Sequence, residues 1–118
     1  MDTYTIYHNP RCSKSRAALA ILQERKLPVR IIEYLKQPPS RDELAALRKQ
    51  LGVPPNQWVR SGEAEYKAAG LSASSSESAL LDAMAKHPIL IERPIIVHSI
   101  RAIVARPPER VLELIKTS

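Results

Sequence analysis

The sequence predicts an α/β fold in which a four-stranded mixed β-sheet carries a helical insert. Three observations predict this fold. A strand, a helix and a second strand succeed one another within residues 3–35, helix and loop patterns fill residues 40–88, and two short strands followed by a helix occupy residues 93–118. A chain of 118 residues can bury a core without disulfides or metal ions, so one domain over residues 1–118 is expected.

The first part of the chain predicts a parallel pair of strands. TYTIY at 3–7 alternates and is rich in β-forming residues, and VRIIEYL at 29–35 is a second such segment. An apolar helical pattern runs between them to about Lys26, with Ser13 or Ser15 as its candidate N-cap. Because the connection is a helix, the two strands are expected to lie parallel.

The insert begins with a strong helix signal. Ser40 is the expected N-cap, Glu43 stands at the capping-box position, and Gly52 is expected to end the helix. The clearest later helix is SESALLDAMAKH, whose apolar face is Leu80, Leu81 and Met84.

The last part of the chain predicts a hairpin and a final helix. RPIIVH at 93–98 and RAIVAR at 101–106 are too close for a crossover, so they are expected to pair antiparallel. A helix from Pro107 is expected to finish the chain, with an apolar stripe of Val111, Leu112 and Ile115. The succession βαβ, helical insert and ββα is the thioredoxin-like architecture.

Composition favours a small anionic ligand over a membrane or nucleic acid. No apolar run approaches the roughly 20 residues of a membrane helix, and the N-terminus has no signal-peptide pattern, so a cytoplasmic protein is expected. The net charge is +6, but the basic residues are spread out and aromatic residues are only 4%, which argues against nucleic acid. His87 and His98 lack metal-ligand spacing, so neither a metal nor a bound cofactor is expected.

The one cysteine, Cys12, is the strongest functional candidate. It falls on the loop before the first helix, where unpaired N–H groups and the helix dipole lower a thiol pKa. Arg11, Lys14, Arg16 and His8 are expected to act in the same direction, although Lys14 and Arg16 could equally be solvated charges on the helix. A buried structural cysteine is the alternative, but the flanking charges make burial costly.

The spacing around Cys12 excludes two common cysteine chemistries. A dithiol oxidoreductase needs Cys-x-x-Cys, whereas this chain has Ser15 in the second position. A thiol phosphatase needs an arginine six residues after the cysteine, where Ala18 stands. A second thiol must therefore come from outside, and glutathione or another redox protein is the natural donor in a reducing cytosol.

Three arginines are candidates for binding an oxyanion beside Cys12. Arg93 interrupts a strongly apolar stretch, Arg106 also precedes a proline, and Arg60 lies in the insert. In a thioredoxin-like sheet Arg93 is expected to point at Cys12, with Pro94 at the position of a cis-proline.

The alternatives for these side chains stay open. The three guanidinium groups could cradle a tetrahedral oxyanion, or they could form salt bridges to Glu63, Glu92 or Glu109. His8 could orient the loop, tune Cys12 or satisfy a backbone carbonyl.

Four blocks in order resemble the glutaredoxin-coupled arsenate reductases of the ArsC class. They are TIYHNPRCSKSRAAL, EYLKQPPSRDEL, AMAKHPILIERPIIV and ARPPERVLEL, and together they cover nearly the whole chain. The resemblance implies that Cys12 attacks arsenate, that His8 and Ser15 support its thiolate, and that Pro94 and Arg16 support the site. It also implies that the oxyanion is bound by Arg60, Arg93 and Arg106.

The same resemblance implies the reaction partners. Glutathione is the implied co-substrate and glutaredoxin the implied partner of a monomeric enzyme. One alternative is a transferase of the same fold that acts on glutathione mixed disulfides. Another is an Spx-like regulator that binds RNA polymerase, although its redox switch uses Cys-x-x-Cys and this chain has Ser15 at the second position.

Overall fold

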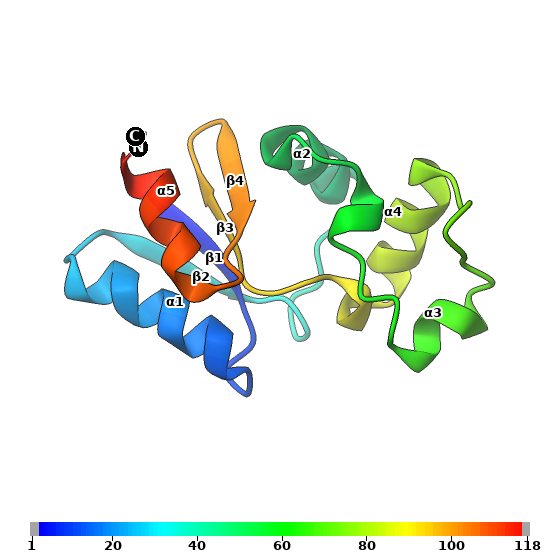
Figure 1. Cartoon of the computed structure of the whole chain (residues 1–118), viewed down its shortest axis with the longest axis horizontal. Coiled ribbons are helices and arrows are strands. Elements are labelled where there is room, and N and C mark those ends of the chain that lie inside the picture. Colours follow the sequence, from blue (N-terminus) through cyan, green and yellow to red (C-terminus); the bar gives the residue numbers. More distant parts are fainter. Residues whose placement is uncertain (1–2, 117–118) are drawn as a thin grey trace.

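One mixed sheet organises the protein in this computed structural model, which describes residues 3–116. Strand β1 (Tyr4–His8) runs parallel to β2 (Val29–Glu33) and antiparallel to β3 (Ile95–His98), which pairs antiparallel with β4 (Arg101–Val104). The strand order is β2-β1-β3-β4 (Figure 1). The predicted α/β, thioredoxin-like sheet is confirmed.

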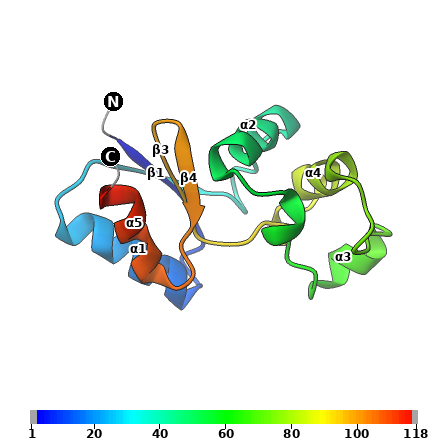
Figure 2. The ribbon, with the colours of Figure 1, turned by 45° about the horizontal axis from the view of Figure 1, so that its top comes forward.

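Two helices cover one face of this sheet. Helix α1 (Ser13–Glu24) connects β1 to β2, and α5 (Val111–Lys116) follows β4 on the same side (Figures 1 and 2). Side chains alternate along each strand, so Ile96 points to this face and Ile95 to the other. The core on the helix-covered face comprises Tyr4, Ile6, Ala18, Leu22, Ile96, Ile103, Ala105, Val111 and Leu114.

The insert packs against the opposite face. Its helices are α2 (Arg41–Leu51), α3 (Ala64–Ala68) and α4 (Glu77–Lys86), and α2 lies along β4 (Figure 2). The core on this side joins insert and sheet without a break: Tyr34, Leu44, Leu47, Trp58, Leu80, Leu81, Ala83, Met84, Leu90, Ile91, Ile95 and Ala102. The described residues extend 42 × 27 × 23 Å.

Several predicted helix signals are confirmed. Ser40 Oγ accepts the Glu43 N–H at 3.1 Å, and Glu43 Oε1 accepts the Ser40 N–H at 2.8 Å, which is a complete capping box. Gly52 ends α2 in the left-handed conformation at φ 71°. The expected apolar face of α4 is buried at Leu80, Leu81 and Met84.

The predicted cap of the first helix is wrong: Cys12, rather than Ser13 or Ser15, is the N-cap residue of α1. A 3₁₀ helix at Pro88–Leu90 lies near residue 88, where the insert was expected to end.

The final helix also begins later than expected. A 3₁₀ turn at Pro108–Arg110 precedes α5, so the helix does not start at Pro107. Of the predicted apolar stripe, Val111 is buried and Ile115 packs against the core, whereas Leu114 is buried in place of Leu112, which is only half-buried.

A short backbone connection joins the insert to the segment before β3. Val59 and Ile91 form an antiparallel bridge, and the Arg60 N–H donates to Leu90 O at 2.7 Å. The Glu92 N–H donates to Trp58 O at 2.9 Å. These bonds bring Arg60 to the segment that carries Arg93.

Within residues 3–116 no helix has the length and apolar character needed to cross a membrane. The predicted domain also includes residues 1, 2, 117 and 118, which lie outside the described residues.

Candidate active site

The site begins at the loop between β1 and α1. Cys12 is extended, at φ −95° and ψ 120°, and its carbonyl accepts the Arg16 N–H at 3.0 Å, which starts the helix. Its own N–H donates to Asn9 O at 3.0 Å. The half-buried thiol therefore lies at the positive end of the α1 dipole.

The environment of Cys12 favours its thiolate. Burial raises the pKa of the thiol, but the N–H groups of Ser15 and Lys14 and the Arg93 guanidinium together outweigh burial and lower the pKa below its usual value. The sequence predicted a lowered pKa for the Cys12 thiol, and the shift in the structure has the same direction.

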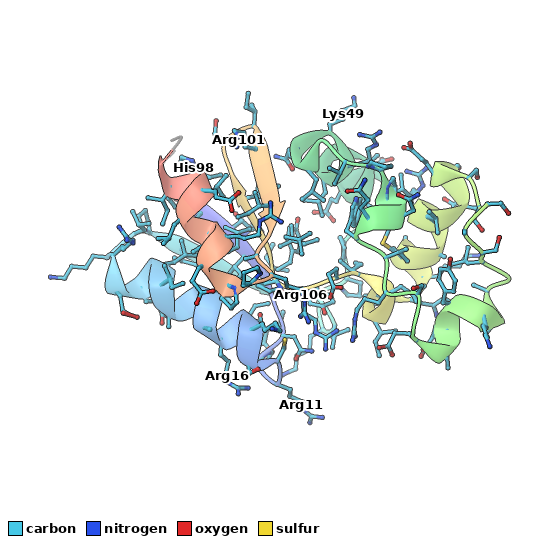
Figure 3. All side chains as sticks on the ribbon, viewed as in Figure 1. Arg11, Arg16, Lys49, His98, Arg101 and Arg106 are labelled. Carbon is cyan, nitrogen blue, oxygen red and sulfur yellow. The ribbon has the colours of Figure 1, made fainter. Side chains whose placement is uncertain are left out.

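The N–H groups at the helix start and Arg93 act as expected, but the side-chain charges next to Cys12 in sequence are not among the main causes of this pKa shift. Arg11 is exposed, and Arg11 and Arg16 project away from the sheet at the edge of the molecule (Figure 3). Lys14 acts through its backbone N–H rather than its ammonium group. Arg16 instead donates from Nη1 to Pro10 O at 2.9 Å and ties the loop to the helix.

His8 and Ser15 form a buried pair beneath the loop. His8 Nδ1 and Ser15 Oγ share a hydrogen bond of 2.6 Å, and the same Oγ accepts the Asn9 N–H at 3.1 Å. Burial lowers the pKa of His8, and Arg16 lowers it further against the opposing effect of Glu33. A neutral His8 therefore adds no positive charge to the thiolate at neutral pH, and its contact is a hydroxyl rather than a backbone carbonyl.

Arg93 acts on Cys12 from the segment before the neighbouring strand, β3. The Arg93–Pro94 peptide bond is cis as predicted, and the guanidinium of Arg93 lowers the pKa of the Cys12 thiol. Arg93 Nε is buried and has no hydrogen-bond partner among the described residues. A buried guanidinium N–H without a partner is costly, which marks this point as a place where a ligand oxygen would be stabilised.

Arg60 and Arg106 lie beside Arg93 and are engaged in ion pairs. Arg60 Nη1 is 2.9 Å from Glu63 Oε2, and Arg60 Nε is 3.7 Å from Glu92 Oε1. Arg106 Nε is 3.9 Å from the same Glu92 oxygen, and Arg106 Nη1 donates to Arg93 O at 3.1 Å. Arg106 thus lies at the junction of sheet and insert (Figure 3). The structure brings the three arginines together and also forms the expected salt bridges to Glu63 and Glu92, but not one to Glu109 within the described residues.

Tyr34 is a part of this site that sequence reasoning missed. It follows β2 directly and is buried; burial raises the pKa of its hydroxyl to about 12, against the opposing charges of Arg93 and Arg60. Cys12 and Glu92 also act on that pKa, which places the phenol among the site residues. The carboxyl ends of parallel strands lie at the same edge of a sheet. Because Cys12 follows the first strand and Tyr34 the second, the sequence could have indicated that the tyrosine lies near the cysteine.

A hollow of about 280 Å³ opens beside the cysteine loop. Its lining residues come from that loop and from the end of β2: His8, Asn9, Pro10, Arg11, Glu33, Leu35 and Lys36. Leu35 is 44% exposed there, so the hollow has an apolar wall next to basic side chains.

With this sheet order and one cysteine at the start of its first helix, the molecule is a single-cysteine protein of thioredoxin-like fold. The sequence profile of the ArsC family matches residues 7–114. The chain belongs to the ArsC family.

Relatives cover nearly the whole chain. An arsenate reductase of Rhizobium meliloti (strain 1021) is 42% identical over 114 residues, which are 96% of this chain and 81% of that protein. The protein YfgD of Escherichia coli (strain K12), described as uncharacterized, is 45% identical over 93% of this chain and 94% of its own. The solved structure of an arsenate reductase from Vibrio cholerae superposes with a TM-score of 0.89 at 46% identity, over 94% of this chain and 96% of that one.

Proposed function

We propose that this protein reduces arsenate to arsenite, with Cys12 as the nucleophile. The observation that supports this most directly is the contact between Cys12 and Arg93, whose buried Nε has no partner among the described residues. An attacking thiolate and a donor for the oxygen of its target thereby stand side by side. Relatives named arsenate reductases support the choice of substrate.

The proposed reaction proceeds through sulfur–arsenic bonds. The Cys12 thiolate attacks arsenic and one arsenate oxygen leaves as water after protonation, while Arg60, Arg93 and Arg106 hold the remaining oxygens. Glutathione then replaces a second oxygen, again with loss of water. Glutaredoxin attacks the glutathione sulfur, the electron pair of the sulfur–arsenic bond stays on arsenic, and water releases arsenite from Cys12. One mixed disulfide is formed and As(V) becomes As(III), so the electrons balance.

His8, Ser15 and Arg16 have supporting roles in this proposal. The His8–Ser15 hydrogen bond and the Arg16 contact to Pro10 hold the loop that presents the thiol. Tyr34 and the cis Pro94 form the buried side of the same site.

A coupled assay tests the function directly. Oxidation of NADPH is followed in the presence of arsenate, glutathione, glutaredoxin and glutathione reductase, and we expect turnover that Cys12→Ser abolishes. Arg93→Ala should weaken oxyanion binding by roughly 2 kcal/mol, because it removes a desolvated charge partner. Wild-type turnover no faster than that of Cys12→Ser would refute arsenate reduction.

The hollow next to the loop favours a second candidate, a glutathione-dependent thiol transferase. Lys36 and Arg11 provide cations for the carboxylates of a tripeptide, and Leu35 provides an apolar wall. The same preparation is therefore assayed with a glutathione mixed disulfide in place of arsenate. Turnover with the disulfide alone would support the transferase over the reductase.

A further inference from the structure

The carboxylate of Glu92 is shared by two side chains of the arginine cluster. Its Oε1 is 3.7 Å from Arg60 Nε and 3.9 Å from Arg106 Nε, and it accepts the Arg93 backbone N–H at 3.2 Å. One acceptor oxygen therefore contacts two of the guanidinium groups proposed to bind the oxyanion, as well as the backbone of the residue that carries the third. Glu63, in contrast, forms an ion pair only with Arg60 among the residues that the structure describes.

This carboxylate is largely withdrawn from water. The Glu92 side chain is 27% exposed, and those of Arg60 and Arg106 are 25% and 34% exposed. Charges in such a setting are screened less than on an open surface, so a ligand oxygen there interacts strongly with Glu92.

A carboxylate in this place distinguishes tetrahedral anions by their protons. Ionised Glu92 can only accept hydrogen bonds. An oxyanion that bridges the three arginines meets this acceptor, and an oxygen without a proton is repelled by it. An oxygen that carries a proton donates to it. Hydrogen arsenate and hydrogen phosphate carry a proton at neutral pH, whereas sulfate has the same charge as those dianions and no proton.

We propose that Glu92 is a specificity-determining residue that selects protonated tetrahedral oxyanions and excludes sulfate. The inference rests on the proposed oxyanion site but concerns selection among anions rather than reduction. The selection uses the proton of the ligand, since net charge alone does not separate sulfate from hydrogen phosphate.

An NMR titration of the full chain with inorganic phosphate or sulfate, at matched ionic strength, tests this inference. Phosphate serves as the arsenate analogue that does not react with the thiol. Backbone N–H signals of Lys14 and Ser15 report on occupancy beside Cys12. We expect the wild-type protein to bind phosphate at least roughly tenfold more tightly than sulfate.

Glu92→Gln should raise sulfate affinity by roughly tenfold and leave phosphate affinity nearly unchanged, because the amide can donate to sulfate. Glu63→Gln is the matched control, and it should shift both anions by the same factor. Glu92→Asp, which keeps the carboxylate, should retain the preference for phosphate.

Two results would overturn the inference. They are equal affinities of the wild-type protein for the two anions, and an unchanged preference for phosphate over sulfate in Glu92→Gln. The first needs no variant, so a folding defect cannot hide it. Failed arsenate turnover with an intact phosphate preference would refute the reductase alone, and turnover without any preference would refute the Glu92 inference alone.

Discussion

The pKa of a cysteine thiol at the start of a helix depends on opposing effects, and at Cys12 the effects that lower the pKa are the larger ones. Burial disfavours the thiolate, while the N–H groups of Ser15 and Lys14 and the guanidinium of Arg93 favour it more strongly. The stabilising groups are therefore the backbone N–H groups in the first turn of α1 and the side chain of Arg93, which is far from Cys12 in the sequence. The neighbouring basic side chains mainly face solvent or hold the loop.

The first prediction concerns the pH dependence of Cys12 reactivity. The alkylation rate with iodoacetamide should rise with a midpoint below the ordinary thiol value of about 8.5, because only the thiolate reacts. Arg93→Ala should raise the midpoint, since the thiolate loses a positive partner. Arg11→Ala is the control and should leave it unchanged. A midpoint that moved with Arg11 and not with Arg93 would contradict the assignment.

The second prediction concerns Ser15, whose hydroxyl is buried between His8 and the Asn9 N–H. Ser15→Ala leaves these groups without a partner and should lower the free energy of unfolding by about 1–3 kcal/mol. Ser13→Ala, exposed on the same helical turn, should change it by less than about 0.5 kcal/mol. Urea unfolding measures both, and equal effects would show that the His8–Ser15 contact contributes little.

At the scale of elements, a local sequence motif predicts a helix boundary correctly where all of its residues are present. The capping box of α2 forms as predicted because Ser40 and Glu43 satisfy each other's backbone groups. The N-cap of α1 differs from the expected one because two serines follow Cys12 and either could serve as a cap. Only the path of the loop, with the Cys12 N–H bonded to Asn9 O, decides among them.

The third prediction tests the end of α2. Gly52 has φ 71°, and an added Cβ would meet open space beyond its own chain neighbours, so the penalty for a side chain comes from the left-handed conformation. Gly52→Ala should cost about 1–2 kcal/mol of the free energy of unfolding. Gly62→Ala meets equally open space without a positive φ and should change stability by less than about 0.5 kcal/mol. Equal thermal-melting shifts would show that the conformation of Gly52 carries no penalty.

At the scale of the whole molecule, the insert and the sheet share one core. Trp58 is fully buried in the insert, and the same cluster reaches Ile95 on β3 and Ala102 on β4. The Val59–Ile91 bridge adds a backbone link at the arginine cluster. Burial of apolar area across this junction favours unfolding of both parts together.

The fourth prediction follows from this shared core. Trp58 is the only tryptophan, so its fluorescence reports on the insert, and Cys12 reactivity reports on the sheet side. Urea unfolding followed by these two probes should give one coincident transition. Two separate midpoints would show that the insert is an independent unit and would contradict the single-domain prediction.

By itself the sequence determined the order of strands and helices, the hairpin, the cis-proline position and the candidacy of Cys12. The elements and the candidacy of Cys12 follow from short-range periodicity, breaker residues and one cysteine placed before a helix, and the cis-proline position follows from the fold class that these elements predict. The sequence also made Arg60, Arg93 and Arg106 candidates for the site, but only the tertiary structure added Tyr34 and decided which partners these side chains have. The five residues Arg60, Arg93, Arg106, Glu92 and Tyr34 meet because strand pairing and the insert bring distant segments together. Charge acts through space and falls with distance, so proximity in the folded chain, not along the sequence, sets the chemistry of the site.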